Sequence, residues 1–266
     1  MRKKHSPIAV IYSALIFLFL YAPIVVLIVY SFNANKSRGS WGGFSLKWYQ
    51  SLFENSQIMS SLGTTLTIAL ISSMVAMVIG TMAALGMYAS RKRTRNLLNN
   101  IASLPMSNPD IVTGVSLMIL FIFLGIRLGY ISLLLSHIAF DVPYVIVSVL
   151  PKLNQMDKNT FEAAQDLGAT PIQAFFKVIL PEILPGIFTG TMLAFTMSLD
   201  DFVVSFFTAG NGVSTLSMTV YSMTRKGVKP EINAISAIMF VTVLILLVII
   251  NVRSSKDARQ KEKQNY

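Results

Sequence analysis

Four aspartates are the residues of this sequence whose placement points most directly to chemistry. They lie within, or at the ends of, long apolar stretches: Asp110, Asp141, Asp200 and Asp201. A carboxylate at the centre of a bilayer costs about 2.5–3.5 kcal/mol on insertion scales, so it usually faces a cavity or a partner. No Lys or Arg lies at comparable depth to neutralise these acids. They predict a negative path for a cation, and the rings of Tyr144 and Tyr221 offer further faces for an ammonium group.

Each aspartate also has a structural alternative. Asp110 follows Pro109, where the backbone is broken, so its carboxylate can cap a restarting helix. Asp141 stands two residues before Pro143 and can satisfy backbone groups that the proline frees. The side chains of the adjacent pair at 200 and 201 differ by about 100° around a helix. We therefore expect one of the pair to face the path and the other to cap a break, and either assignment fits the sequence.

Several kinds of chemistry are excluded by what the sequence lacks. It contains no cysteine, so it offers no disulfide, thiol nucleophile or thiolate metal site. Its two histidines, His5 and His137, are far apart in sequence, and a contact between helices fits His137 better than a metal ligand does. No GxxxxGK[ST] phosphate loop is present, so the chain itself is not expected to bind ATP. We expect no catalytic residue, no metal and no cofactor.

The elements that position the aspartates are long apolar stretches. Hydrophobic residues make up 53% of the 266 residues and charged residues only 13%, about half of what soluble domains carry. Each stretch reaches the roughly 20 residues that cross the hydrocarbon of a bilayer and lacks the polar stripe of a soluble helix. The sequence predicts an all-α membrane protein with six transmembrane helices, over Ile8–Phe32, Leu62–Tyr88, Ile101–Ile126, Tyr130–Leu153, Ile183–Thr208 and Ile232–Val252.

Basic residues orient these spans. With the N-terminus inside, 15 of the 22 Lys and Arg fall on the cytoplasmic side. Because cytoplasmic loops carry the excess of basic residues, both termini are expected in the cytoplasm. The formal charge of +10 is then a signal of topology and of contact with lipid headgroups in the bilayer, and nucleic acid is not an expected partner.

The loop between the fourth and fifth spans, about 154–181, carries a distinctive motif. Glu162-Ala163-Ala164 joins strong helix formers with small side chains that another surface can approach closely. Gly168 permits a turn, Thr170 can cap a helix and Pro171 suits a first helical position. The pattern predicts two short helices joined at a glycine, a rigid projection suited to docking a soluble partner.

This motif carries a family resemblance. Glu-Ala-Ala, three residues and Gly168, followed by Ile179-Leu180-Pro181, resembles the EAA loop of ABC-importer permeases, except that Val178 stands where the family commonly has Ile. Three further segments closely resemble the C-type permeases of spermidine/putrescine importers, and this second match covers nearly the whole chain. The segments are Ser107-Asn108-Pro109-Asp110-Ile111-Val112, Phe195-Thr196-Met197-Ser198-Leu199-Asp200-Asp201 and Lys229-Pro230-Glu231-Ile232-Asn233-Ala234.

The resemblance implies a type I (MetI-like) ABC-importer permease bundle, a single permease domain over residues 1–266 in the bacterial inner membrane. Its loop would couple to a cytoplasmic ATPase through Glu162, Ala163, Ala164, Gly168 and Pro181. The implied partners are two ATPase copies, a second homologous permease and an extracytoplasmic polyamine-binding protein. The implied function is polyamine import by alternating access, driven by ATP hydrolysis on the ATPase.

Three alternatives remain open at this point. The chain can serve an ABC importer of another small solute, although an anion would need a cationic lining that the spans lack. It can be an ion-coupled secondary transporter that uses the aspartates as proton or sodium sites, which leaves the EAA loop unexplained. It can be a membrane scaffold that transports nothing, which leaves the unpaired acids unexplained.

Overall fold

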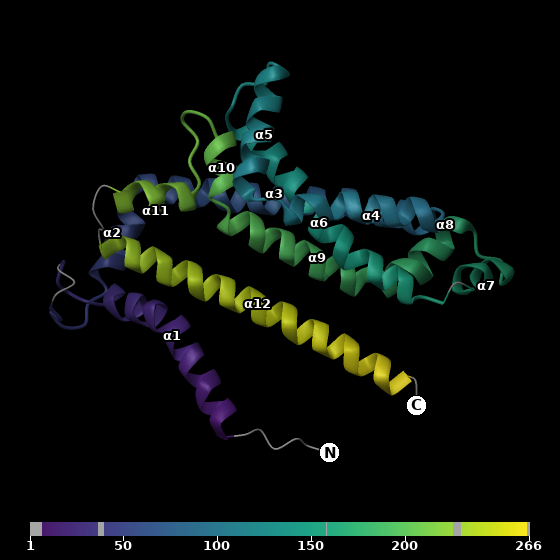
Figure 1. Cartoon of the computed structure of the whole chain (residues 1–266), viewed down its shortest axis with the longest axis horizontal. Helices are drawn as coiled ribbons and strands as arrows, with labels where there is room; N and C mark the ends of the chain where they lie inside the picture. The colour runs from purple at the N-terminus through teal and green to yellow at the C-terminus, as the bar shows by residue number, and fades with distance from the viewer. Residues whose placement is uncertain (1–6, 37–39, 158, 226–229, 265–266) are drawn as a thin grey trace. The chain divides into compact units, whose positions relative to one another are not determined.

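The structure, a computed structural model, describes residues 7–36, 40–157, 159–225 and 230–264, and side chains only between residues 10 and 249 of these ranges. The described part is helical (Figure 1), and its extended pairing is one antiparallel bridge between Asn33 and Phe44. The expected all-α class is confirmed. The helices are α1 (Pro7–Ser31), α2 (Lys47–Glu54), α3 (Ser56–Ala89), α4 (Lys92–Ser107), α5 (Asp110–Phe123), α6 (Tyr130–Gln155), α7 (Thr160–Asp166), α8 (Pro171–Ala174), the π-helical turn η1 (Phe175–Ile179), α9 (Leu180–Asp200), α10 (Val203–Thr208), α11 (Leu216–Arg225) and α12 (Pro230–Gln264).

Five stretches of helix are long and apolar enough to cross a membrane: Val10–Ser31, Ser56–Ala89, Tyr130–Gln155, Pro171–Asp200 and Pro230–Ile249. The stretch expected as the third span consists of α4 and α5, which are bent by 102° where they meet, and it makes a sixth span when the pair is counted as one. Pro109 explains the break, because proline disfavours the helical conformation in the residue before it. Asn108 accordingly has an extended backbone, with ψ at 145°.

The fifth span differs from its expected bounds of 183–208. Helix runs without interruption from Pro171 through η1 and α9, so the apolar helix begins well before Ile183. It then ends at Asp200, and α10 begins again at Val203. The break that the sequence analysis expected at this adjacent pair of aspartates is present, and Asp201 there has an extended backbone with ψ at 128°.

The chain divides into two compact units, and each is described by itself. The first contains residues 1–59 and 220–244, and the second contains residues 60–219 and 245–266. The expectation of one domain over the whole chain stays a prediction. The charge count also used basic residues at 2–4, 38, 158, 226, 229 and 253–263, whose side chains lie outside the described residues, so the side of the membrane on which each terminus lies also stays a prediction.

In the second unit α3, α6 and α9 share one core. Ala76 and Ala84 of α3, Val145 and Val149 of α6 and Ile183 of α9 belong to a single buried cluster. In Figure 1 α6 and α9 lie alongside each other over much of their length. Three helices packed in this way place polar residues of one helix within reach of the others.

Small residues allow α6 and α9 to approach closely. A Cβ on Gly190 would stand 2.9 Å from the Val145 Cα, and one on Gly186 would stand 2.9 Å from the Ser148 carbonyl oxygen. The two glycines are four residues apart on α9, the spacing by which helix backbones come together in membranes. This pair of glycines was not singled out from the sequence.

In the first unit, the segment after α1 folds back on itself. The Trp48 indole N–H donates to the Asn33 carbonyl oxygen at 2.7 Å, and the Tyr49 hydroxyl lies 2.8 Å from the Ser31 hydroxyl. The rings of Phe32 and Phe44 stack with centroids 5.1 Å apart. These contacts give the segment between α1 and α2 a defined structure of its own.

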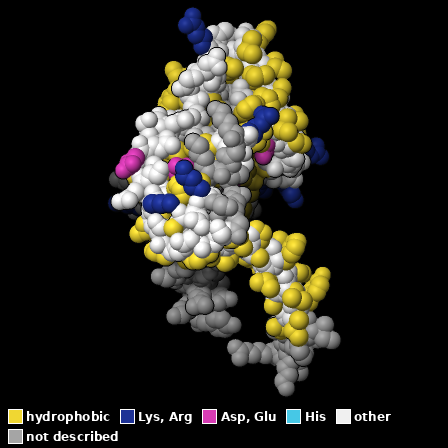
Figure 2. All heavy atoms as spheres, turned by 90° about the vertical axis from the view of Figure 1, so that its left-hand side faces the viewer, with side chains coloured by type: hydrophobic (Ala, Val, Ile, Leu, Met, Phe, Trp, Pro, Cys, Tyr) yellow, Lys and Arg dark blue, Asp and Glu magenta, His cyan; other side chains and the backbone are white. Residues whose placement is uncertain are grey.

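The exposed surface of the helices is strongly apolar. Figure 2 shows hydrophobic side chains in broad stretches of the visible surface, with only scattered charged ones. Phe19 of α1 is 81% exposed and Phe123 of α5 is 85% exposed. Exposed apolar area on this scale indicates a surface in contact with lipid or with other membrane subunits.

Candidate functional site

The break between α9 and α10 separates the roles of two adjacent aspartates. The Asp201 carboxylate accepts the backbone N–H of Val204 at 3.2 Å and that of Ser205 at 2.7 Å. These bonds satisfy N–H groups that a new helix leaves without partners, so Asp201 caps α10. Asp200, the last residue of α9, is exposed, and its carboxylate makes no hydrogen bond or ion pair with the described residues. Asp200 therefore is the member of the pair that is free to meet a ligand.

Asp141 is buried in the second unit among polar side chains of other helices. Its side chain is fully buried, and the Ser72 hydroxyl on α3 donates to its Oδ2 at 2.6 Å. Its Oδ1 has no hydrogen-bond partner among the described residues. Asp141 therefore bonds to a neighbouring helix and not, as the structural alternative held, to backbone groups freed by Pro143.

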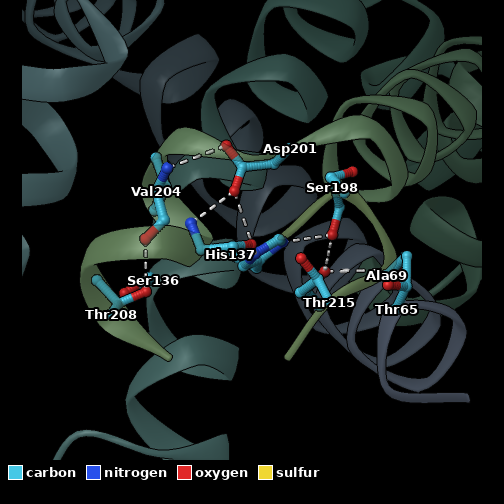
Figure 3. Close-up of polar contacts among 12 residues, drawn as sticks. Thr65, Ala69, Ser136, His137, Ser198, Asp201, Val204, Thr208 and Thr215 are labelled. Atoms are coloured by element: carbon cyan, nitrogen blue, oxygen red, sulfur yellow. Dashed lines mark hydrogen bonds and ion pairs between the residues drawn. The ribbon is translucent and has the colours of Figure 1, made fainter. Parts of the chain in front are cut away.

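His137 lies at the centre of these contacts (Figure 3). Its Nδ1 is 2.6 Å from the Ser198 hydroxyl of α9, and its Nε2 is 3.0 Å from the Ser205 hydroxyl of α10. Nε2 also stands 3.7 Å from the Asp201 carboxylate, and the Ser198 hydroxyl is 3.3 Å from that of Ser72. We call His137, Ser72, Ser198, Ser205, Asp141 and Asp201 the polar centre.

Asp110 and Tyr144 lie outside the polar centre. Asp110 is the first residue of α5, is exposed, and makes no hydrogen bond or ion pair within the described part of the chain. Tyr144 of α6 is partly buried and its ring packs against Phe140 with centroids 5.4 Å apart.

Tyr221 is separated from the other candidates by the division of the chain. It belongs to the first unit, where the Arg225 guanidinium carbon stands 5.9 Å from the centroid of its ring. An arginine is therefore already placed near that aromatic face. Within the second unit the structure groups Asp141 with Asp201 through the polar centre, whereas Asp110 and Tyr144 make no hydrogen bond or ion pair with that group among the described residues.

The sequence analysis missed the serines of the polar centre and the hub role of His137. No role was predicted for Ser72, Ser198 or Ser205 from the sequence. One signal was present: His137 and Asp141 are four residues apart on α6, which puts both on one face of the helix. Among the described residues no group of three or more His, Cys, Asp or Glu side chains is placed to hold a metal ion.

The loop with the Glu-Ala-Ala motif has the expected form. Helices α7 and α8 flank Gly168, whose φ is +88°, a conformation that favours glycine. The Thr170 hydroxyl accepts the Gln173 backbone N–H at 3.3 Å, and the Gln173 side chain accepts the Thr170 N–H at 3.1 Å. This is a capping box, and Pro171 occupies the first helical position after it. Two short helices joined at a glycine are confirmed.

Exposed groups on this loop mark one surface. Glu162 and Ala163 are exposed, Ala164 is partly buried, and Pro181 is exposed near the start of α9. Two large apolar side chains join them: Leu167 is 90% exposed and Ile172 is 71% exposed. Apolar side chains exposed in a loop that also carries charge are typical of a surface that binds another protein.

Comparison with known proteins places this geometry in a family. Residues 76–256 match the family model described as "Binding-protein-dependent transport system inner membrane component". Over 250 residues the chain is 40% identical to the spermidine/putrescine transport system permease protein PotC of Escherichia coli K12, covering 94% of this chain and 93% of the relative. Over 241 residues it is 40% identical to the putrescine transport system permease protein PotI of the same strain, covering 88% and 86% of the two chains.

A solved structure supports the fold. A chain of a bacterial ABC transporter that imports the acidic polysaccharide alginate superposes with a TM-score of 0.68 at 18% identity, over 94% of each chain. That likeness shows the fold of an ABC-importer permease. The family description adds that its members are inner-membrane transport components that work with a binding protein. The family model covers more than half of the chain and both relatives align over most of their length, so the chain belongs to the binding-protein-dependent transport system inner membrane components.

Proposed function

We propose that the chain is a permease subunit of an ATP-driven importer of polyamines, spermidine or putrescine, in the bacterial inner membrane. The observation that carries the proposal is a pair of exposed carboxylates at breaks in membrane helices. Asp110 begins α5 after one break and Asp200 ends α9 before another. Neither has a hydrogen bond or ion pair among the described residues. The transport systems named for the two relatives carry spermidine or putrescine, which are cations.

The chemistry of the two breaks suits ammonium groups. An ammonium group that leaves water needs a carboxylate or an aromatic face in its place. Asp110 and Asp200 supply carboxylates, and Tyr144 supplies an aromatic ring. Asp141 and Asp201 belong to the same proposed pathway, but each already accepts hydrogen bonds from protein groups. We therefore assign direct contact with substrate to Asp110 and Asp200 first.

The loop about 154–181 is the proposed coupling element. The exposed Glu162 and Leu167 are proposed to dock on a cytoplasmic ATPase, and Gly168 holds α7 and α8 in a fixed relation. The complete importer is proposed to contain two ATPase copies, a second homologous permease and an extracytoplasmic polyamine-binding protein. Both termini of this chain are then cytoplasmic. Closure of the ATPases would move the loop and open the pathway outward, which is alternating access.

The test is stimulation of ATP hydrolysis by substrate. The complete importer, purified in lipid vesicles, is expected to hydrolyse ATP faster when its binding protein is loaded with spermidine or putrescine. Vesicles supplied with the unloaded binding protein are the control. Equal rates with loaded and unloaded protein would contradict polyamine import, and stimulation by another small solute alone would reassign the substrate.

A further inference from the structure

His137 holds both sides of the break between α9 and α10. Its Nδ1 meets Ser198 two residues before Asp200, and its Nε2 meets Ser205 four residues after Asp201, at 2.6 and 3.0 Å. Its side chain is 1% exposed. One buried imidazole on α6 therefore fixes the end of α9 and the start of α10 relative to each other, with Asp200 between them.

The neighbours of His137 determine which way its hydrogen bonds run. The Ser72 hydroxyl donates to Asp141, so Ser72 accepts from Ser198. The Ser198 hydroxyl donates its hydrogen to Ser72, so the Ser198 oxygen accepts a hydrogen bond from the imidazole. The ring proton of His137 then lies on Nδ1. Nε2 is left as an acceptor for the Ser205 hydroxyl. In this arrangement the hydrogen bonds run in one direction, from Ser205 through His137, Ser198 and Ser72 to Asp141.

We propose that His137 is a positioning residue for Asp200. It keeps the exposed carboxylate in place by holding the helix ends on both sides, without touching substrate itself. The Asp201 cap fixes only the start of α10, whereas at the end of α9 the Ser198 hydroxyl meets both His137 and Ser72. This proposal rests on the proposed function, in which Asp200 contacts the cation.

Three substitutions separate the two bonds of His137. His137→Leu removes both, His137→Asn keeps a polar group near Nδ1, and His137→Gln keeps one near the position of Nε2. In the complete importer, His137→Leu is expected to raise the KM for polyamine uptake about fivefold or more, because two hydrogen bonds are lost. Asn and Gln are expected to give smaller increases in KM. Ser148→Ala is the matched control, because this α6 hydroxyl donates only to the Tyr144 carbonyl oxygen in its own helix.

A second readout does not depend on transport. The natural chain has no cysteine, so a single cysteine at Asp200→Cys can be labelled alone. Its rate of reaction with a charged thiol reagent is expected to change severalfold when His137→Leu is added. The rate at Thr94→Cys, an exposed position on α4, is expected to stay constant, because that site does not depend on the polar centre.

The outcomes distinguish this proposal from the function on which it rests. Unchanged reactivity at position 200 together with an unchanged KM would overturn the positioning role of His137. If the His137→Leu variant does not assemble into an importer, the other two variants decide the question. Wild-type KM values in both His137→Asn and His137→Gln would then overturn the positioning role. If Asp200→Asn transports polyamine normally while His137→Leu still alters reactivity at position 200, the cation route fails and the positioning geometry stands.

Discussion

The polar centre and the loop about 154–181 are held together in opposite ways. In the polar centre, hydrogen bonds join residues far apart in the sequence, such as Ser72 with Asp141 and His137 with Ser198. In the loop, the contacts are local: a capping box between Thr170 and Gln173 and a turn at Gly168. In the proposed function, the first region keeps helices connected near the cation route and the second is a compact projection for a soluble partner. The difference predicts that the two regions fail differently when they are changed.

The largest effect is expected in the loop, from Gly168→Pro. Gly168 has φ at +88°, whereas proline holds φ near −65°, so the turn between α7 and α8 cannot form. We expect ATP-dependent uptake to fall to background while the protein still inserts, because the loop contributes little to the packing of the spans. Uptake into vesicles, together with the amount of inserted protein, measures this.

Gly168→Asn is the matched control for the loop, since asparagine tolerates positive φ better than other residues with a Cβ. It is expected to retain most of the uptake. Full uptake in the proline variant would remove the loop from the coupling mechanism.

The next effect is on packing beneath the polar centre. Gly190→Ala adds a Cβ 2.9 Å from the Val145 Cα, so α6 and α9 must separate. Overpacking of this kind costs about 1–3 kcal/mol. The thermal midpoint of the purified complex is expected to fall. Gly63→Ala serves as the control, because a Cβ there has no neighbour within 4 Å. An equal thermal midpoint for the two variants would show that α6 and α9 do not depend on close contact at Gly190.

The smallest effect is expected at the α10 cap. Asp201→Ala removes the acceptor for two backbone N–H groups, and loss of a cap costs about 0.5–2 kcal/mol. Asp201→Asn keeps an acceptor and is expected to lie close to wild type in thermal midpoint. If Asn destabilised the complex as much as Ala, the charge of Asp201, and not its capping oxygen, would be what stabilises this region.

The same contrast explains how much of the molecule the sequence predicts. The helices and the loop followed from residues close together in the chain, because apolar length, proline, glycine and capping residues act locally. A break at Asp200 and Asp201 was expected, but which of the two caps it was left open, because two adjacent aspartates look alike until a backbone direction is known. The contacts of Ser72, Ser198 and Ser205 also escaped prediction, since which helix faces which depends on tertiary packing.

The most direct test of the central claim is polyamine uptake by the complete importer with both exposed carboxylates neutralised. Asp110→Asn combined with Asp200→Asn keeps shape and hydrogen bonding and removes charge, and Glu54→Gln, at an exposed acid that ends α2, is the control. A hydrogen bond to a charged group contributes about 1.5–3 kcal/mol, so each substitution is expected to lower kcat/KM for spermidine about tenfold or more. Together the two substitutions should lower it further, while the control stays at wild type. Wild-type uptake kinetics in the double variant would contradict the cation route and leave only the family assignment.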